Sequence, residues 1–216
     1  LQTYLKQAKI IHIDIDNAEI DKNVKTDVAL VADCKEALPL LTQLIQKADH
    51  SKWIESFEPL REREDACVTQ KATHPTEGPL LMGEVVSAVA EATQGMGVTV
   101  TDVGQNQLFG TRYSRYNTPR SIVTSGGLGT MGYGLPAAIG ASFAEKERPI
   151  CVFLGDGGLQ MTIQEFGTIM EYHCPVKIIL LNNNYLGNVR QWQDLFFQKR
   201  YAFTHMLNPN YEPIAA

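Results

Sequence analysis

Two short apolar runs joined by a helical pattern constrain the fold more than any other feature of this chain. They are ICVFL at residues 150–154 and VKIILL at residues 176–181. Runs of this length and composition are typical of strands that are buried on both faces of a sheet. Because a helix that connects two strands of one sheet makes them parallel, we expect an α/β fold with a doubly wound, mostly parallel sheet.

The same alternation of helix and strand begins after Gly78. The sequence predicts two earlier strands, VTVTD at 98–102 and SIVT at 121–124, with a polar loop, VGQNQ, after the first. A helix is predicted from Ile163 to Tyr172, capped by Thr162. Further helices are predicted for the stretches MGEVVSAVAEAT, LPAAIGASFA and NVRQWQDLFF. These elements define a domain at 78–216.

Residues 1–48 predict the end of another α/β domain. The stretch IIHIDI alternates as a strand does. Asp33 stands three residues before Glu36, a capping-box-like spacing that predicts Asp33 as the cap of the helical pattern KEALPLLTQLIQK. Pro39 falls in the second turn of that pattern and lacks a backbone donor. We therefore expect this helix to begin late or to kink.

Residues 49–77 are charged and show no periodicity, as in REREDACVTQKATHP. Such a stretch is typical of a solvated linker between two domains. The chain also starts at Leu1 without a methionine and stops soon after the irregular segment NPNYEP. We therefore expect a piece of a longer protein, in which the domain at 78–216 is truncated at its C-terminus.

Charge and composition exclude several classes of protein. The 216 residues carry 19 basic and 24 acidic side chains, a formal net charge of −5, and the basic residues form no stripe. This argues against nucleic acid as a partner. The four cysteines form no C-x-x-C pair, which fits a reducing cytoplasm. No apolar run approaches the roughly 18 residues that span a bilayer, and there is no signal peptide, so we expect no membrane partner.

Polar residues follow both of the apolar runs, ICVFL and VKIILL. Asp156 stands in GDGG after the first, and Asn183 stands in NNN after the second, 27 positions later. Loops that follow parallel strands meet at the same edge of a sheet, and carboxylate and amide oxygens suit Mg²⁺. Gly157 and Gly158 would let the backbone approach a phosphate. Asp-Gly and Asn-Asn are also common turns, but both together after two buried strands favour a magnesium–diphosphate site.

The glycine stretch SGGLGTMGYG allows a second interpretation. Gly127, Gly129 and Gly132 spell G-x-G-x-x-G, and Asp156 follows 24 residues after the last of them, where a ribose-binding acid would stand. A dinucleotide site would leave GDGG and NNN unexplained, however. The preceding stretch SIVTS is also more polar than a buried first strand should be. This alternative stays open at the level of the sequence, as the weaker one.

The joint pattern resembles a known family. GDG followed at this distance by NN is similar to the signature of thiamine-diphosphate-dependent enzymes. TDVGQNQ, TSGGLGTMGYGLPAAIGA, NNNYLGNVRQWQ and RYAFTHMLNP narrow the resemblance to the large catalytic subunit of the acetolactate synthases. The front of the chain, HIDIDNAEIDKN…VAD, is similar to the end of that family's central, FAD-carrying domain, and 78–216 to its thiamine pyrophosphate-binding domain.

The resemblance implies roles for individual residues. Mg²⁺ would be held by Asp156, Asn183 and the main-chain oxygen of Tyr185. Met131 would support the thiazolium ring, and Trp192 would line the substrate entrance, although both side chains would otherwise be assigned to the core. The diphosphate and the rest of the cofactor would meet Gln105, Asn106, Gly129, Gly157, Gly158 and Gly187, and FAD would pass Asp14 and Asp33.

The implied reaction is the decarboxylation of pyruvate and its condensation with a second 2-keto acid, pyruvate or 2-ketobutyrate. The products would be 2-acetolactate or 2-aceto-2-hydroxybutyrate, and FAD would take no net redox part. The whole enzyme would be a homodimer or homotetramer, with a small regulatory subunit in some cases. The glutamate that activates the cofactor would come from an N-terminal pyrimidine-binding domain, so we expect the chain alone to be inactive.

Two positions depart from the family pattern. Asn188 stands where methionine is usual, and Ala32 stands where glycine is usual before Asp33. Two alternatives also remain open. One is another thiamine-diphosphate-dependent carboligase or oxidase, such as glyoxylate carboligase or pyruvate oxidase. The other is a non-catalytic domain that kept the fold, against which the presence of both Asp156 and Asn183 argues.

Overall fold

The computed structural model describes residues 6–75 and 77–215. The chain divides between Glu58 and Pro59 into two units. Within the described ranges, no helix is long and apolar enough to cross a membrane.

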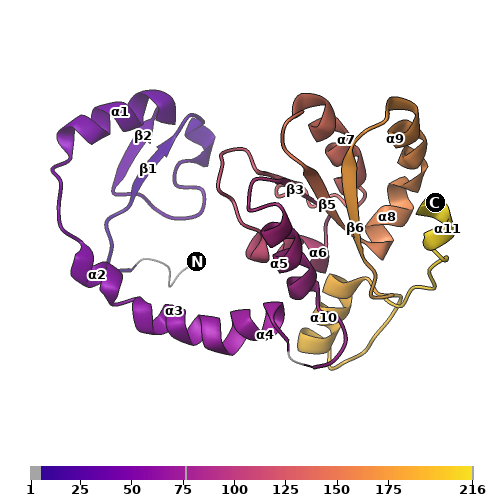
Figure 1. Ribbon diagram of the computed structural model, residues 1–216. Coiled ribbons are helices and arrows are strands. Elements are labelled where there is room, and N and C mark those ends of the chain that lie inside the picture. The colour runs from indigo at the N-terminus through magenta and orange to yellow at the C-terminus, as the bar shows by residue number, and fades with distance from the viewer. Residues whose placement is uncertain (1–5, 76, 216) are drawn as a thin grey trace. The chain divides into compact units, whose positions relative to one another are not determined.

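A four-stranded sheet lies at the centre of the larger unit (Figure 1). Its order is β4 (Ile122–Thr124), β3 (Val98–Thr101), β5 (Ile150–Gly155) and β6 (Val176–Leu181), and every neighbouring pair is parallel. In the register of the sheet, Val152 of β5 pairs with Val100 on one side and with Ile178 on the other. The parallel α/β fold predicted from the apolar runs is confirmed.

Helices cover both faces of this sheet. One face carries α7 (Gly134–Ala144), α8 (Asp156–Thr162) and α9 (Phe166–Tyr172), and its buried core includes Leu135 and Leu159. The other carries α5 (Met82–Ala92) and α6 (Gln105–Tyr113), packed around Val86 and Phe153. The strand β5 is almost wholly buried, as its continuous apolar run predicts, and so is β3, although its sequence VTVT alternates. The burial on both faces expected for VKIILL is wrong, because β6 lies at the edge of the sheet and is only partly buried.

Three local predictions in this unit are wrong. The polar stretch VGQNQ is not all loop, because α6 begins at Gln105, where Asn106 is buried and donates from Nδ2 to the Phe153 carbonyl at 3.0 Å. GDGG is not a loop either, because α8 begins at Asp156. Thr162 caps nothing with its side chain. Its hydroxyl donates at 3.2 Å to the carbonyl of Gly132, and a 3₁₀ turn, Ile163–Glu165, separates α8 from α9.

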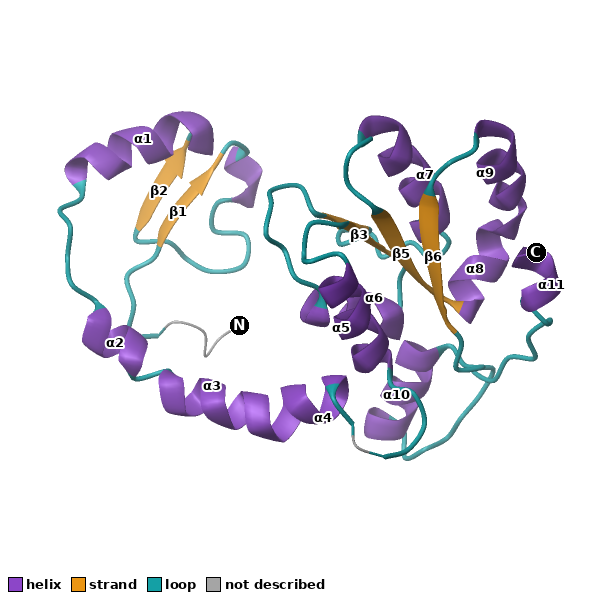
Figure 2. Cartoon of the chain, viewed as in Figure 1, coloured by secondary structure: helices purple, strands orange, loops and turns teal. Residues whose placement is uncertain are grey.

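After β6 the chain forms α10 (Gly187–Phe196), a long irregular segment and the short helix α11 (Glu212–Ala215), as Figure 2 shows. The irregular segment returns to the loop after β6, where Tyr185 and His205 form an isolated antiparallel bridge. Both segments lie at the end of the sheet where the strands finish. This return places C-terminal residues beside the strand ends.

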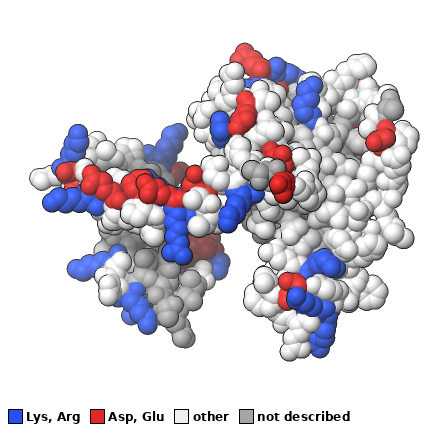
Figure 3. Space-filling view, turned by 60° about the horizontal axis from the view of Figure 1, so that its bottom comes forward, with Lys and Arg blue, Asp and Glu red and all other residues white. Residues whose placement is uncertain are grey.

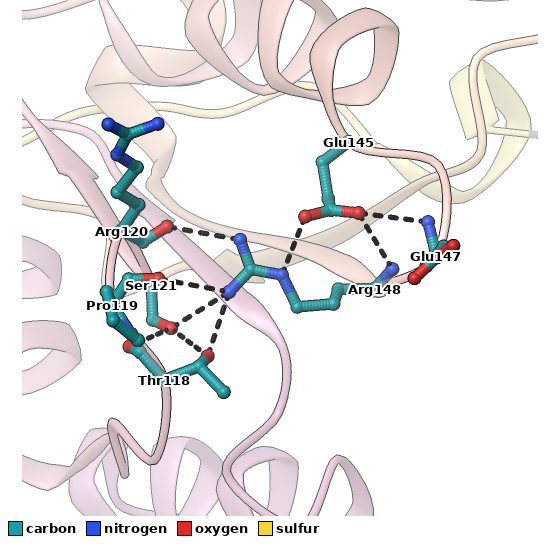
Figure 4. A network of polar contacts seen from close by, with 7 residues as sticks. All are labelled: Thr118, Pro119, Arg120, Ser121, Glu145, Glu147 and Arg148. Carbon is teal, nitrogen blue, oxygen red and sulfur yellow. Dashed lines mark hydrogen bonds and ion pairs between the residues drawn. The ribbon is translucent and has the colours of Figure 1, made fainter.

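At the other end of the sheet, where the strands begin, Arg148 bonds several neighbouring residues just before β5 (Figure 4). Its guanidinium donates from Nη1 to Thr118 Oγ1 at 2.9 Å and to Ser121 Oγ at 3.1 Å, and from Nε to Glu145 Oε2 at 2.7 Å. The backbone N–H of Glu147, and then Arg148, hold the pKa of the Glu145 carboxyl below its usual value. These bonds join the loops that lead into β4 and β5, so we assign this end of the sheet a role in stability.

The smaller unit contains two parallel strands, β1 (Ile11–Asp14) and β2 (Val28–Val31), a 3₁₀ turn, Asn17–Glu19, and α1 (Cys34–Leu44). The predicted cap is confirmed, since Asp33 Oδ1 accepts from the N–H of Lys35 at 2.8 Å. The expected late start of α1 is wrong, because the helix begins at Cys34 and runs through Pro39. One missing donor does not end a helix that is already capped.

Residues 49–77, predicted as a linker, are largely helical. They form α2 (Ser51–Glu55), α3 (Glu58–Glu64), a π-helical stretch, Asp65–Thr69, and α4 (Gln70–Thr73). Nearly all of these residues are exposed, and Glu64 forms an ion pair with Arg112 of α6. On the face of the molecule seen in Figure 3, acidic and basic side chains are interspersed.

Candidate functional site

A cleft of about 190 Å³ opens at the carboxyl end of the parallel sheet. It lies where the chain leaves β3 for α6 on one face and leaves β5 for α8 on the other, so that the two loops diverge. In open α/β sheets, ligands bind at such a switch point. Ten residues predicted from the sequence line it: Gln105, Asn106, Gly129, Met131, Asp156, Gly157, Gly158, Asn183, Tyr185 and Gly187.

Asp156 supplies the negative charge of this cleft. It is the first residue of α8, directly after β5, and it is 2 % exposed. Its Oδ2 accepts a hydrogen bond of 2.6 Å from Nδ2 of Asn208. Among the described residues that line the cleft, Asp156 is the only acidic one. A cation bound here would therefore meet one full carboxylate charge from the protein.

Asn183 connects three parts of the cleft. It follows β6, and its Oδ1 accepts from the N–H of Tyr185 at 3.0 Å. Its Nδ2 donates to Oε1 of Gln105 at 3.2 Å, and Nε2 of Gln105 donates to Gln191 at 3.3 Å. The loop after β3, the loop after β6 and α10 are thereby fixed relative to one another. The two strand-end residues singled out in the sequence thus line one cleft, as predicted.

The glycine stretch is held by a residue that the sequence analysis missed. Asp102 follows β3 directly and is fully buried. Its Oδ1 accepts from the N–H of Gly132 at 3.2 Å, and its Oδ2 accepts from the N–H of Gly134, the first residue of α7, at 2.8 Å. A third bond of 2.8 Å comes from the N–H of Val103. The signal was in the sequence, since Asp102 stands at a strand end as Asp156 does.

These bonds argue against the dinucleotide interpretation. A dinucleotide pyrophosphate binds to free backbone N–H groups in the glycine turn and at the start of the following helix. Here the N–H groups of Gly132 and Gly134 are already bonded to a buried carboxylate. An anion at the same place would be repelled by Asp102. The glycine stretch is therefore not a pyrophosphate-binding turn of the dinucleotide type. Its contribution to the cleft consists of Gly129 and Met131, which line it.

Two of the cleft glycines are also required by packing. A Cβ on Gly158 would meet the carboxylate of Asp102, with Cγ of Asp102 only 2.7 Å away. A Cβ on Gly157 would lie 2.9 Å from Cδ2 of Leu186. The backbone of α8 is thus in close contact with the loop after β3 and the loop after β6.

Asn188 introduces an unusual polar group into the lining. Its Oδ1 is buried, and it is the one buried side-chain nitrogen or oxygen in the described part of the chain that lacks a hydrogen-bond partner. The side chain lines the cleft beside Gly187 and Val189. An unpaired buried acceptor of this kind costs about 1–3 kcal/mol of stability. The departure from methionine noted in the sequence therefore has a structural consequence.

The rings of Tyr185 and Tyr201 both contact the guanidinium of Arg190. The guanidinium of Arg190 lies 4.3 Å from the centre of the Tyr185 ring and 4.0 Å from that of Tyr201. The Tyr201 hydroxyl donates to Asp194 at 2.5 Å, and this bond raises the pKa of Tyr201. Such cation–π contacts fix the loop that carries Asn183.

Trp192 is the predicted site residue of the larger unit that the structure leaves out of the cleft. Its side chain is 62 % exposed, and its ring lies 5.1 Å from that of Phe196. It lines a separate hollow with Val189 and Phe197. The alternative assignment to the core is wrong, because so exposed a ring contributes little to packing.

Asp14 and Asp33 belong to the smaller unit. Oδ1 of Asp14 accepts from the N–H of Asp16 at 2.8 Å, and Asp33 caps α1. Both bonds are local ones: Asp33 caps a helix, whereas Asp14 bonds only the backbone of the turn after β1. The expected proximity of the two residues to FAD stays untested.

A metal in the cleft beside Asp156 would need ligands from outside the protein. In the part of the chain that the structure describes, no group of three or more His, Cys, Asp and Glu residues is placed to hold a metal ion. One carboxylate and neutral oxygens balance only part of the charge of a divalent cation. The donor set therefore fits a hard cation that is shared with an anionic ligand such as a diphosphate.

Residues 102–216 match the family described as thiamine pyrophosphate enzyme, C-terminal TPP binding domain. Residues 1–41 match the central domain of thiamine pyrophosphate enzymes. The chain thus matches two domains of the thiamine pyrophosphate enzymes.

Individual relatives are similar over nearly the whole chain. The acetolactate synthase large subunit of Lactococcus lactis is 41% identical over 212 residues, which are 97% of this chain and 36% of the relative. The isozyme 1 large subunit of Escherichia coli is 41% identical over 216 residues, 100% of this chain and 38% of the relative. Acetolactate synthase 1, chloroplastic, of Nicotiana tabacum is 39% identical and is covered to 32% of its length. The chain thus spans about a third of these relatives.

Proposed function

The chain belongs to the thiamine pyrophosphate enzymes, and on that premise we propose that its cleft binds thiamine diphosphate together with Mg²⁺. The observation that carries the proposal is the position of Asp156 and Asn183, which follow neighbouring strands and line one cleft. Asp156, Asn183 and the main-chain oxygen of Tyr185 would be the protein ligands of the cation. The diphosphate would supply the remaining negative charge.

The other lining residues fit the rest of the cofactor. Gly157 and Gly158 carry no side chain between the α8 backbone and the cleft, so their N–H groups can approach a phosphate. Half-buried Met131 offers an apolar support for a ring. Around it lie Gln105, Asn106, Gly129 and Gly187.

The reaction we propose is the synthesis of 2-acetolactate, or 2-aceto-2-hydroxybutyrate, from pyruvate and a second 2-keto acid. Thiamine diphosphate, when bound, supplies the electron sink that permits decarboxylation and carbon–carbon bond formation. The chain's own residues hold the cation, orient the cofactor and shape the pocket. The relatives reported above are all named acetolactate synthases, which favours this reaction over another carboligase or an oxidase.

The substrate-facing residues are proposed at the start of α10. Asn188 lines the cleft itself, and exposed Trp192 lies one turn further along the helix. A bulky ring beside the cleft would help to select between pyruvate and 2-ketobutyrate, which differ by one methylene. Such a difference is worth only about 1–3 kcal/mol in an apolar pocket.

Several properties of the whole enzyme are proposed from the resemblance alone. The smaller unit would belong to an FAD-carrying central domain, with Asp14 and Asp33 beside a non-redox FAD, and residues 49–77 would connect it to the thiamine pyrophosphate-binding domain. The complete enzyme would be a cytoplasmic homodimer or homotetramer, with or without a small regulatory subunit. The activating glutamate would come from a separate pyrimidine-binding domain.

The test uses the full-length protein that contains this chain. We expect wild type to form acetolactate from pyruvate, and Asp156→Ala to lose both this activity and Mg²⁺-dependent thiamine diphosphate binding, measured by calorimetry. Circular dichroism would show that the variant is folded. If Asp156→Ala binds the cofactor as tightly as wild type does, the proposed site is refuted. If the wild-type protein forms a product other than acetolactate, only the proposed reaction is refuted.

A further inference from the structure

The irregular segment after α10 is attached to the loop that carries Asn183. The N–H of Leu186 donates to the carbonyl of Thr204 at 2.8 Å, and the N–H of Met206 donates to the carbonyl of Asn184 at 2.9 Å. These two bonds flank the bridge between Tyr185 and His205, whose rings lie 5.2 Å apart. The segment is therefore fixed in register beside the loop, and Asn208 follows two residues after its last bond.

The Asn208 carboxamide joins the two strand ends that carry the proposed ligands. Its Nδ2 lies 2.6 Å from Oδ2 of Asp156, and 2.9 Å from Oδ1 of both Asn182 and Asn184. Its Oδ1 accepts from Nε2 of Gln160 at 2.7 Å. One side chain thus bonds the start of α8 and also both neighbours of Asn183.

Three oxygens compete for the two hydrogens on Nδ2 of Asn208, and the carboxylate of Asp156 is the strongest acceptor. An amide nitrogen carries two hydrogens, but three oxygens surround it here. The carboxylate is the charged acceptor and makes the shortest of the three bonds, as charge-assisted hydrogen bonds do. Asn208 therefore holds Asp156 Oδ2 firmly and shares its second hydrogen between the two asparagines.

This arrangement leaves Asp156 suited to a cation. Its Oδ1 accepts no hydrogen bond from the described residues, and, unlike Oδ1 of Asn188, this atom is not enclosed by protein, because Asp156 lines the cleft. A neutral amide fixes the orientation of the carboxylate without neutralising it, whereas a lysine or arginine at this place would compete with the metal. The bonds to Asn182 and Asn184 set the position of the loop on either side of Asn183.

We propose that Asn208 is a positioning residue for the cation site, which orients Asp156 and holds it in register with Asn183. The inference rests on the proposed function, because the cation is the one assigned there. Asn208 itself would not touch the metal. Residues that orient metal ligands in this way typically change metal affinity 10- to 100-fold when they are replaced.

The experiment measures cation binding in the full-length protein that contains this chain. Mn²⁺, as a probe for Mg²⁺, is titrated at saturating thiamine diphosphate and followed by electron paramagnetic resonance. We expect Asn208→Leu to bind Mn²⁺ about 10- to 100-fold more weakly than wild type. Asn208→Ser, which stays polar but is too short to reach Asp156, should show the same loss and covers the case in which the leucine variant does not fold.

Tyr211→Phe is the matched control. Its hydroxyl accepts from Nε2 of Gln160 at 3.2 Å, so it belongs to the same network but makes no hydrogen bond to Asp156 among the described residues. We expect wild-type Mn²⁺ affinity in this variant. Unchanged affinity in both Asn208 variants would overturn the inference, and so would an equal loss in Tyr211→Phe, which would indicate a general loosening of the segment. Asp156→Ala separates the two levels: if it binds Mn²⁺ normally, the proposed cation site itself is wrong.

Discussion

The two units of the chain place aspartates at strand ends in the same way but use them differently. In the smaller unit, Asp14 ends β1 and Asp33 follows β2, and each accepts a backbone N–H two residues ahead. In the larger unit, Asp102 follows β3 and Asp156 follows β5, and each bonds residues at least 30 positions away. A strand-end aspartate thus bonds only its own turn in one unit and connects distant segments in the other.

Burial accounts for the difference. Asp102 is fully buried and Asp156 is 2 % exposed, whereas Asp33 is exposed. In the larger unit, helices on both faces of the sheet remove these carboxylates from water, so that every oxygen needs a protein partner or a ligand. In the smaller unit, β2 is exposed along its whole length among the described residues, and water competes with each bond. The same local pattern therefore predicts a functional site only where the sheet is covered.

The sharpest test of this comparison replaces one aspartate in each unit. We expect Asp102→Ala to lower the free energy of unfolding of the larger unit by about 3–5 kcal/mol, because it leaves the buried N–H groups of Gly132 and Gly134 and the half-buried one of Val103 unsatisfied. The matched variant Asp33→Ala removes a cap and should cost about 1 kcal/mol. Urea unfolding followed by circular dichroism measures both, and similar losses would contradict the role given to burial.

Much of the larger unit was predictable because its strands are short apolar runs with polar residues directly after them. β6 has the predicted bounds, and β5 is one residue longer. Asp156 and Asn183 were recognised because they follow these two strands. The sequence could not give the strand order, since periodicity carries no information about which strands pair.

Two kinds of residue escaped prediction for physical reasons. Asn208 stands in a segment without periodicity, and its partners lie between 24 and 52 positions away, so nothing local marks it. The start of α8 was missed because two glycines oppose helix formation, yet tertiary packing of Gly158 against Asp102 outweighs this preference. Contacts of this kind exist only once the chain has folded.

A smaller effect is expected when Asp102 is kept and the glycine that packs against it, Gly158, is replaced. Gly158→Ala would place a Cβ against that carboxylate and should cost about 1–3 kcal/mol, as overpacking does. Gly140→Ala is the control: this glycine lies exposed in α7, and a Cβ added there would meet no neighbouring atom within 4 Å, so the variant should gain about 0.5–1 kcal/mol from helix propensity. Thermal unfolding would show opposite shifts, and a stabilised Gly158→Ala would mean that Asp102 is less constrained than its bonds indicate.

The smallest expected effect concerns Asn188, whose Oδ1 is the one buried side-chain oxygen or nitrogen of the described residues without a hydrogen-bond partner. Oδ1 of Asn188 lacks a partner in the described structure, so Asn188→Met removes an unsatisfied acceptor and should stabilise the larger unit by about 1 kcal/mol, or about 2–4 °C in Tm. Asn23→Met in the smaller unit replaces an exposed asparagine and should change stability by less than about 0.5 kcal/mol. Differential scanning calorimetry without cofactor resolves the two. A lower melting temperature for Asn188→Met would show that Oδ1 is paired in solution. Every buried polar side-chain atom described in the larger unit would then have a partner, which would sharpen the contrast with the exposed polar groups of the smaller unit.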